Sequence, residues 1–332
     1  MQLFFSIIVP VYNRPDEVDE LLESLTKQTY QHFEVIIVED GSTNHCQPIV
    51  ETYRTHLNIR YFFKENSGQG FSRNYGMERA KGDYFIFFDS DCLIPSHYLD
   101  TVNAFINEND VAAYGGPDRA HPTFTPIQKA ISYAMTSFFT TGGIRGGKDI
   151  DPKKFNPRSF NMGFARKVFE KVGGFTRPYL AEDIEMSIRI NTAGFTTQLI
   201  PKAYVYHKRR TSFRQFYKQV HFFGRARVSL FKQYPMACKP IYFLPALFIA
   251  GLLGLLTLSI AIGTAVPLYL PSVYYLLIFI DAWLIQKLSW KTALLTIPAT
   301  FLQLTGYGWG FIQHFWQHIV LGKDNFAILR RG

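Results

Sequence analysis

A long interval in the C-terminal third of the chain carries almost no charge. Between Ile241 and Gln286 the only charged residue is Asp281. The interval divides at AIGTAVP into two apolar runs, IYFLPALFIAGLLGLLTLSI and LYLPSVYYLLIFIDAWLI. Each run has about the ~20 residues that a bilayer-spanning helix needs. This feature constrains the fold most, because it predicts two membrane-spanning helices; a pair of buried helices in a soluble protein is the alternative.

The charges that flank the two runs predict their orientation. The segment from Lys202 to Lys239 contains ten Lys or Arg residues and no Asp or Glu, and Lys287 and Lys291 follow the second run. The loop between the runs has no Lys or Arg. Because basic residues tend to stay on the cytoplasmic side, the two helices should form a hairpin with both ends in the cytoplasm.

A third apolar segment, TALLTIPATFLQLTGYGWGFIQHFW, contains Gln303, Gln313 and His314. We expect a third span here, and a re-entrant or interfacial segment is the alternative. The glycines of this segment, at every second position in GYGWG, are typical of close helix packing or of a bend.

The N-terminal segment and the cysteines indicate the compartment. MQLFFSIIVPVYNRPDE has no basic n-region and no small-residue cleavage site, so we expect no signal peptide and a cytoplasmic N-terminal region. The three cysteines, Cys46, Cys92 and Cys238, are far apart and lack metal-ligand spacing. Neither a disulfide framework nor a zinc site is therefore expected, and a reducing compartment fits best.

The first 206 residues follow a different pattern. Short runs rich in Ile, Val, Phe and Tyr, namely FSIIVPVY, EVIIVED, IRYFFKE and DYFIFFD, alternate with stretches of helical spacing. Pro15 and the acidic residues after it mark the start of the first helix. The alternation predicts an α/β domain with a mostly parallel sheet and helices on both faces. Ligands bind such sheets at the carboxyl ends of the strands, so a site is expected at VYNR, VEDGS, KENSGQG and DSD.

Two carboxylates, Asp89 and Asp91, stand one residue apart where the run DYFIFF ends. Such residues at a strand end often only make a turn. Tyr12, Asn13 and Asp40, however, place further polar groups at other strand tips of the same predicted edge. A carboxylate pair at this spacing can hold a hard divalent cation, and the cation would neutralise a diphosphate leaving group.

The ordered motifs resemble family 2 glycosyltransferases with the GT-A fold. The likeness covers about residues 4 to 207 and rests on SIIVPVYNRPDEVDELLESLTKQTYQHFEVIIVEDGS, SGQGFSRNYGMERAKGDYFIFFDSD and GGFTRPYLAEDIEMSIRINTAGF. It implies a Rossmann-like mixed sheet, a nucleotide-sugar donor and a divalent cation, Mn²⁺ or Mg²⁺. The residues implied to bind the nucleotide sugar are Pro10, Tyr12, Asn13, Asp40, Gly68, Arg73, Asp89 and Ser90. Asp89 and Asp91 are implied to bind the metal.

The pair Glu182 and Asp183, in YLAEDIEMSIRI, begins a predicted helix, where acidic residues complement the helix dipole. The resemblance implies instead that the two are the catalytic pair, with Asp183 as the base of an inverting displacement. His207, at the end of the last predicted strand, matches the place of a third metal ligand. The alternative for His207 is a histidine among basic residues at a membrane surface.

The segment 208–240 is both basic and amphipathic. Phe213, Phe216, Val220 and Phe223 recur at spacings of three and four, with Lys and Arg on a neighbouring stripe. We expect a helix that lies in the membrane interface against anionic lipid, and no nucleic-acid partner, because the charges directly precede the apolar runs. The segment lacks the Gln-x-x-Arg-Trp motif of processive polysaccharide synthases, which argues against a polymer-extruding enzyme.

These interpretations divide the chain into a GT-A domain (1–207), the interfacial helix (208–240) and a membrane region (241–332) with two or three helices. They predict a multi-pass enzyme of the cell inner membrane whose catalytic domain is cytoplasmic. It would transfer a sugar to a hydroxyl of a lipid-linked glycan for surface polysaccharide. Transfer to polyprenyl phosphate, or a non-catalytic nucleotide-sugar-binding subunit, is the alternative. The region from Pro117 to Ser159 is expected to form a mobile loop at the acceptor site.

Overall fold

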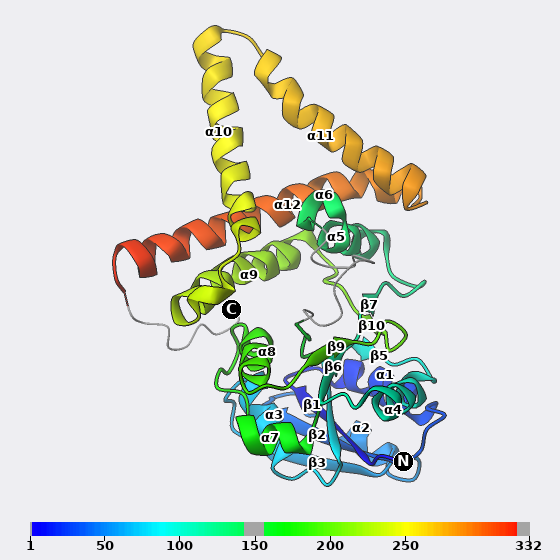
Figure 1. Cartoon of the computed structure of the whole chain (residues 1–332). Helices are drawn as coiled ribbons and strands as arrows, with labels where there is room; N and C mark the ends of the chain where they lie inside the picture. The colour runs from blue at the N-terminus through cyan, green and yellow to red at the C-terminus, as the bar shows by residue number, and fades with distance from the viewer. Residues whose placement is uncertain (1, 143–155, 324–332) are drawn as a thin grey trace. The chain divides into compact units, whose positions relative to one another are not determined.

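The computed structural model describes residues 2–142 and 156–323 of the chain (Figure 1). The contacts within the chain divide it into two compact units. The first, which we call the sheet unit, comprises Met1–His121 and Asp149–Lys208. The second, the helical unit, comprises Pro122–Lys148 and Arg209–Gly332.

A seven-stranded sheet forms the centre of the sheet unit, in the order β3-β2-β1-β4-β8-β6-β9. Its strands are β1 (Phe5–Val11), β2 (Phe33–Asp40), β3 (Ile59–Lys64), β4 (Tyr84–Phe88), β6 (Ala113–Gly115), β8 (Asn161–Ala165) and β9 (Thr197–Leu199). The strands β1 to β4 are parallel, and β8 runs antiparallel to both β4 and β6. The predicted mixed, mostly parallel sheet is confirmed. A second, three-stranded sheet joins β5 (Cys92–Leu93), β10 (Val205–His207) and β7 (Asp118–Arg119).

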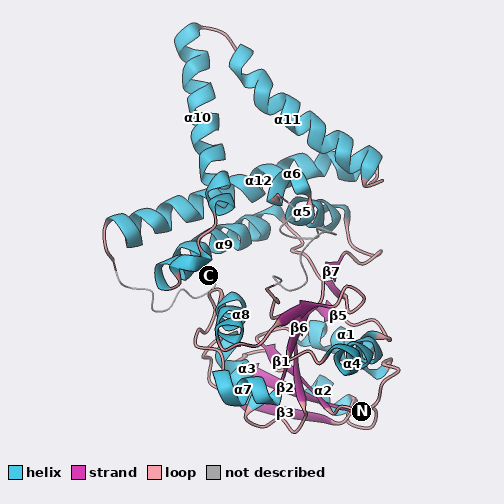
Figure 2. Ribbon diagram, in the orientation of Figure 1, coloured by secondary structure: helices cyan, strands magenta, loops and turns pink. Residues whose placement is uncertain are grey.

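Helices cover both faces of the large sheet, as predicted (Figures 1 and 2). One face carries α1 (Pro15–Thr26), α2 (Gln47–Thr52) and α4 (Tyr98–Asn109), and the other carries α3 (Gln69–Met77), α7 (Arg166–Val172) and α8 (Glu182–Thr192). The first helix begins at Pro15, with acidic residues in its first turn. Its buried face is Val18, Leu21, Leu22 and Leu25. This apolar stripe explains why α1 packs on the sheet.

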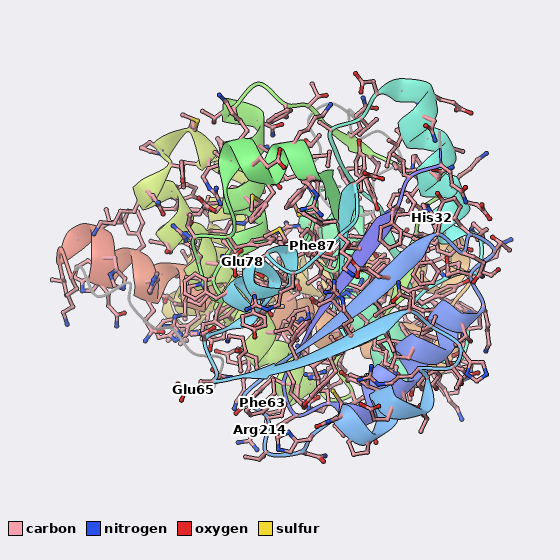
Figure 3. All side chains as sticks on the ribbon, turned by 90° about the horizontal axis from the view of Figure 1, so that it is seen from below. His32, Phe63, Glu65, Glu78, Phe87 and Arg214 are labelled. Atoms are coloured by element: carbon pink, nitrogen blue, oxygen red, sulfur yellow. The ribbon has the colours of Figure 1, made fainter. Side chains whose placement is uncertain are left out.

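The core of the sheet unit is built from the continuous apolar strands. Every residue of β2 and β4 is buried, as expected for parallel strands covered on both faces. Figure 3 labels Phe87, on the central strand β4, and Phe63, on the edge strand β3. Phe87 is fully buried and Phe63 is 49% exposed. The core is therefore centred on β1, β2 and β4, the strands whose ends carry the predicted site residues.

The helical unit contains the two apolar runs that the sequence predicts to span a membrane. Its helices and short helical turns are α5 (Pro126–Thr136), α6 (Phe138–Thr141), α9 (Phe213–Gln233), η2 (Pro235–Ala237), η3 (Pro240–Phe243), α10 (Leu244–Ile262), η4 (Val266–Leu268), α11 (Tyr269–Ile280), η5 (Asp281–Ile285), α12 (Trp290–Phe315) and η6 (Trp316–Val320). Pro240–Ile262 and Val266–Ile285 are long and apolar enough to cross a membrane. Many of the large apolar side chains of α10 and α11 are exposed.

The third predicted span is the helix α12, which packs closely along α9. Gly306 and Gly310 of α12 contact the α9 backbone or side chains, and a Cβ added at Gly310 would lie 2.2 Å from the carbonyl oxygen of His221. On α9, a Cβ added at Gly224 would lie 2.1 Å from the carbonyl oxygen of Tyr307. Close helix packing is therefore the role of these glycines. Helix α12 is long enough to cross a membrane, but over its described residues it is less apolar than the two candidate spans, Pro240–Ile262 and Val266–Ile285.

The region from Pro117 to Ser159 differs from the expected mobile loop over the part that the structure describes. Thr125 and Gln128 form a capping box that starts α5. Helix α5 buries Ala130, Ile131 and Ala134 in a cluster with residues of α9 and α12. Residues 143–155 of this region lie outside the described residues. The segment from Pro122 to Gly142 thus belongs by its contacts to the helical unit, not to the GT-A region where the sequence placed it.

Candidate active site

Polar side chains from three parallel strands meet at one edge of the large sheet. β1 pairs in parallel with both β2 and β4, so the three strands end side by side. Tyr12 and Asn13 follow β1, Asp40 ends β2, and Asp89 follows β4. Pro10 lies one residue inside the end of β1. The structure therefore brings together the strand tips at which the sequence predicted a site.

Asp40 organises the loop that follows β3. Its Oδ1 accepts hydrogen bonds from Lys64 Nζ at 2.6 Å and from the backbone N–H of Ser67 at 2.9 Å, and its Oδ2 accepts one from the N–H of Gly68 at 2.8 Å. Gly68 has a positive φ of 99°, and a Cβ there would lie 2.7 Å from the side chain of Pro178. Only glycine fits this position. The buried carboxylate predicted to bind the nucleotide thus also holds Gly68, a second predicted binding residue.

Asn13 holds the loop that follows β2. Its Oδ1 accepts hydrogen bonds from the backbone N–H groups of Thr43 at 2.8 Å and Asn44 at 3.0 Å, and its own N–H donates to Ser42 Oγ at 2.9 Å. The neighbouring side chain of Tyr12 is 52% exposed. At this edge of the sheet, Asn13 therefore holds the loop that follows β2, and Tyr12 leaves much of its aromatic ring exposed.

Arg73 joins two carboxylates inside the sheet unit. Its side chain is fully buried, with Nη2 at 2.6 Å from Asp89 Oδ1 and Nη1 at 3.2 Å from Glu182 Oε1. Glu182 also accepts hydrogen bonds from Gln69 and, at 3.4 Å, from Ser159 Oγ. A buried cation between two carboxylates fixes the direction of both. Glu182 therefore faces inward, as a partner of Arg73.

A carboxylate, an imidazole and a thiol converge at the small sheet. In the antiparallel pair of β5 and β10, His207 stands directly opposite Cys92, so their side chains lie on the same face. Nε2 of His207 lies 3.1 Å from Oδ1 of Asp91. One ligand atom from each of Asp91, Cys92 and His207 lies within 4.8 Å of the others. The ring of His207 is stacked on Phe160, with 4.5 Å between the ring centroids, which fixes its orientation.

This cluster fits a divalent cation. Carboxylate oxygen is a ligand that Mn²⁺ and Mg²⁺ prefer, and imidazole nitrogen suits transition metals. Burial raises the pKa of the Cys92 thiol well above its ordinary value, and the charges of Asp91 and Asp89 raise it further. Cys92 is therefore a neutral thiol at neutral pH, and Asp91 and His207 are the pair that would hold a hard cation. The spacing of the cysteines in the sequence does not predict Cys92 at this site. Cys92 lies beside His207 because β5 pairs with β10.

A permanent positive charge neighbours the same carboxylate. Nη1 of Arg14 lies 2.6 Å from Glu17 Oε2 and 3.7 Å from Asp91 Oδ2. Burial acts to lower the pKa of Arg14, but Glu17, Asp91 and Asp89 outweigh it and raise that pKa. Ser90 Oγ is 3.5 Å from Glu17 Oε2. A charged guanidinium at this sheet edge is suited to contact a phosphate group.

Asp183 differs from its neighbour Glu182 in exposure. Its Oδ1 accepts a hydrogen bond from the backbone N–H of Ile184 at 2.8 Å, and its Oδ2 lies 3.5 Å from Arg158 Nη1. The Asp183 side chain is 16% exposed, whereas that of Glu182 is 5% exposed. Of the predicted pair, Asp183 is therefore the carboxylate that a second substrate can reach.

Sequence reasoning missed Arg14, Cys92 and Arg158 as members of the site. Arg14 and Cys92 stand beside predicted residues, in the motifs VYNR and DSDC, but nothing in the motifs distinguishes them. Arg158 lies in a segment without any recognisable pattern. Arg158 lies at the site because it comes shortly before β8, and the start of β8 pairs with the end of β4 at the same sheet edge.

The chain is similar to several known proteins. A family model described as "Glycosyl transferase family 2" matches residues 6–173. The poly(ribitol-phosphate) beta-N-acetylglucosaminyltransferase TarS of Staphylococcus aureus is 41% identical over 109 residues, which are 32% of this chain and 19% of that protein. The O-antigen chain rhamnosyltransferase WbaN of Salmonella anatum is 29% identical over 218 residues, 64% of this chain and 68% of that protein.

The match to several relatives is local. The chain spans only 15% and 22% of the lengths of uncharacterized glycosyltransferases of Rickettsia bellii and Rickettsia felis. Among solved structures, the mannosyltransferase PcManGT from Pyrobaculum calidifontis, in complex with GDP-Man and Mn²⁺, has a TM-score of 0.66. It is 20% identical, and the match covers 92% of this chain and 88% of that one, so the likeness is one of fold. The family match covers about half of the chain and includes β1 to β8, with the ends of β1, β2 and β4. This chain therefore belongs to glycosyltransferase family 2.

Proposed function

We propose that the protein transfers a sugar from a nucleotide-diphosphate sugar to a hydroxyl group of a glycan acceptor, by a single inverting displacement that requires a divalent cation. The observation that carries the proposal is the 3.1 Å contact between His207 and Asp91 at the sheet edge where the parallel strands end. The fold-level likeness to a mannosyltransferase solved with GDP-Man and Mn²⁺ supports this proposal.

The donor would lie across the ends of β1, β2 and β4. Tyr12, Asn13 and Asp40 would contact the nucleoside, with Pro10 and Gly68 shaping the backbone around it. Arg73 fixes Asp89 for contact with the donor, and Arg14 is placed to bind the diphosphate beside Asp91. Asp91 and His207 would hold the cation, with Asp89 and Ser90 beside it. A bound divalent cation would neutralise charge on the departing diphosphate.

The acceptor would be activated by Asp183. One carboxylate oxygen of Asp183 takes the proton of the acceptor hydroxyl as its oxygen bonds to the anomeric carbon. The bond from that carbon to the diphosphate oxygen breaks on the opposite face, and the nucleoside diphosphate leaves with the electron pair. Glu182 would act as a positioning residue, because its carboxylate is turned toward Arg73. Arg158 would orient Asp183 from the other side.

We further propose that the reaction takes place at the cytoplasmic face of the inner membrane. The hairpin of α10 and α11 would span the bilayer, and the basic helix α9 would lie in the interface. The relatives TarS and WbaN are named for poly(ribitol-phosphate) and for an O-antigen chain. These names support a glycan acceptor in surface polysaccharide synthesis. We propose that a lipid carries this acceptor, because the reaction would take place at a membrane.

The test is donor hydrolysis and transfer by the full chain, purified in detergent, with a panel of labelled nucleotide sugars. We expect one or a few donors to release nucleoside diphosphate with Mn²⁺ or Mg²⁺ present. Asp91→Asn should abolish this release, whereas Lys27→Gln, which removes an exposed charge just after the end of α1, should leave it unchanged. No release from any donor, or equal release by the Asp91→Asn protein, would contradict the proposal.

A further inference from the structure

A short segment of the sheet unit, residues 174–181, leads into helix α8. It has no helix or strand of its own and lies between the end of α7 at Val172 and the start of α8 at Glu182. Asp183, the proposed base, comes two residues after the segment ends. The position of Asp183 therefore depends on what holds residues 174–181.

The side chain of Asn74, on helix α3, holds the start of this segment. Its Oδ1 accepts a hydrogen bond from the backbone N–H of Phe175 at 2.7 Å, and its Nδ2 donates to the carbonyl oxygen of Phe175 at 2.8 Å. A Cβ added at Gly174 would overlap the amide group of Asn74, so the two stretches of chain lie in direct contact. The ring of Phe175 also packs against Phe87 of the central strand β4. Both the backbone and the side chain of Phe175 are thus fixed.

The loop before α3 holds the rest of the segment. The N–H of Gly70 donates to the carbonyl oxygen of Pro178 at 2.9 Å, and the hydroxyl of Tyr179 donates to Oδ1 of Asn66 at 2.8 Å. A Cβ added at Gly70 would overlap the carbonyl oxygen of Arg177. The approach of the two backbones therefore requires glycine at position 70.

The same loop belongs to the predicted donor site. Asp40 accepts hydrogen bonds from the N–H groups of Ser67 and Gly68, which stand between the two loop residues that contact the segment. The segment that carries the proposed base is therefore attached to the loop that is predicted to bind the donor.

The last residue of the segment has a strained backbone. Ala181 has a φ of 56° and a ψ of 29°, in the left-handed region that residues with a Cβ rarely adopt. Such a conformation persists only where the surrounding structure imposes it. The direction in which α8 begins, and with it the place of Asp183, thus depends on the contacts that hold the segment.

We propose that Asn74 is a positioning residue for Asp183. By holding residues 174–181 against α3, it sets where the carboxylate of Asp183 meets the acceptor hydroxyl, and it takes no part in the proton transfer itself. A misplacement of a catalytic group by about 1 Å can lower a rate by roughly 10²-fold, so a loss of this hold should be measurable. The inference rests on the proposed function, in which Asp183 is the base.

The first experiment measures hydrogen–deuterium exchange of the full chain in detergent, by mass spectrometry, and requires no activity. Asn74→Ala should speed exchange in peptides that cover residues 174–185 by roughly tenfold, because two hydrogen bonds to Phe175 are lost. Peptides that cover β2 should exchange as in the parent protein. Unchanged exchange over residues 174–185 would overturn the proposal, whether or not the parent protein transfers sugar.

Two further variants accompany this measurement. Asn109→Ala is the matched control, because Asn109 is exposed on α4 and donates to the carbonyl oxygen of Phe105 in its own helix. It should leave exchange over residues 174–185 unchanged. Asn74→Leu has nearly the shape of asparagine without either hydrogen bond, so it should give the same faster exchange and serves where Asn74→Ala elutes as aggregate.

The second experiment tests whether Asn74 acts through Asp183. It measures hydrolysis, with water as the acceptor, of the labelled nucleotide sugar that the parent protein hydrolyses fastest. Asn74→Ala should lower kcat by roughly 10- to 100-fold, with the KM for the donor within about threefold of the parent value. Added to Asp183→Asn, the same change should lower kcat by less than about twofold further, because residues that act as a unit have non-additive effects.

Two results of the second experiment would overturn the proposal. One is a kcat of the Asn74→Ala protein equal to that of the parent, and the other is an equal further loss when Asn74→Ala is added to Asp183→Asn. A parent protein that hydrolyses no nucleotide sugar would instead contradict the proposed function, and the exchange experiment would then decide whether Asn74 holds the segment.

Discussion

Nε2 of His207 lies 3.1 Å from Oδ1 of Asp91, although 115 residues separate the two in the chain. The antiparallel pairing of β5 with β10 produces this contact, because it sets His207 opposite the residue that follows Asp91. Two potential ligands thus meet at the edge where the parallel strands end.

Replacing His207 with alanine should raise the Mn²⁺ concentration needed for half-maximal activity by roughly 10- to 100-fold, since even indirect supports of a metal site have effects of this size. The maximal rate at saturating Mn²⁺ should fall less. A titration of activity against Mn²⁺, together with the electron paramagnetic resonance signal of free Mn²⁺, measures both quantities. His32→Ala, which changes a histidine on the loop before β2, is the control. An unchanged Mn²⁺ requirement in the His207→Ala protein would show that His207 is no ligand.

Asp183→Asn should lower the transfer rate by roughly 10²- to 10⁴-fold, the usual contribution of a general base, because the amide cannot take the acceptor proton. The affinity for the donor should stay within a factor of about two, since the described contacts of the Asp183 side chain are with Ile184 and Arg158, not with the predicted donor-binding residues. Calorimetric donor binding and a transfer assay separate the two effects. Transfer by this variant at the wild-type rate would show that Asp183 is not the base. It would favour an acceptor that is already ionised, such as a phosphate.

Arg73→Met should destabilise the protein by about 3–5 kcal/mol, because it leaves Asp89 and Glu182 as carboxylates without their buried cation. Thermal unfolding of the full chain in detergent, followed by intrinsic fluorescence, measures the effect. Adding Glu182→Gln to Arg73→Met should recover part of the loss, since one uncompensated charge disappears.

Arg54→Gln is the matched control for Arg73, because it breaks an exposed ion pair with Glu51 and should not change the melting temperature measurably. A melting temperature for Arg73→Met equal to that of the Arg54 variant would mean that Arg73 does not hold the two carboxylates together.

Gly310→Ala should loosen the packing of α9 on α12, because the added Cβ would lie 2.2 Å from the carbonyl oxygen of His221. Overpacking of this kind destabilises by about 1–3 kcal/mol. Gly251→Ala is the control, since a Cβ there meets no atom within 4 Å among the described residues. We expect the melting temperature to fall for Gly310→Ala and not for Gly251→Ala. A fall for Gly251→Ala alone would contradict the close packing of α9 on α12.

The sequence was sufficient for the elements whose signal is local. The runs that form β1, β2 and β4 are continuous and apolar, so both the strands and the polar residues at their tips could be predicted. Pro15 and the acids after it marked the start of α1 for the same reason. The two candidate spans were evident from their lack of charge.

Features that depend on distant pairing could not be predicted. Cys92 joins Asp91 and His207 only because β10 pairs with β5, and no local pattern encodes that register. The capping box at Thr125 and Gln128 is visible in the sequence, but the partners of α5 in α9 and α12 are not. Likewise, the inward orientation of Glu182 depends on Arg73, which lies 109 residues earlier.

The most direct test of the central claim is the activity of the purified full chain in excess chelator. In the proposed reaction, a divalent cation at Asp91 and His207 offsets the charge of the departing nucleoside diphosphate. We therefore expect release of this product to stop when the chelator is added and to return when Mn²⁺ is supplied above the chelator concentration. Full activity in excess chelator, with the Asp91→Asn protein equally active, would contradict it.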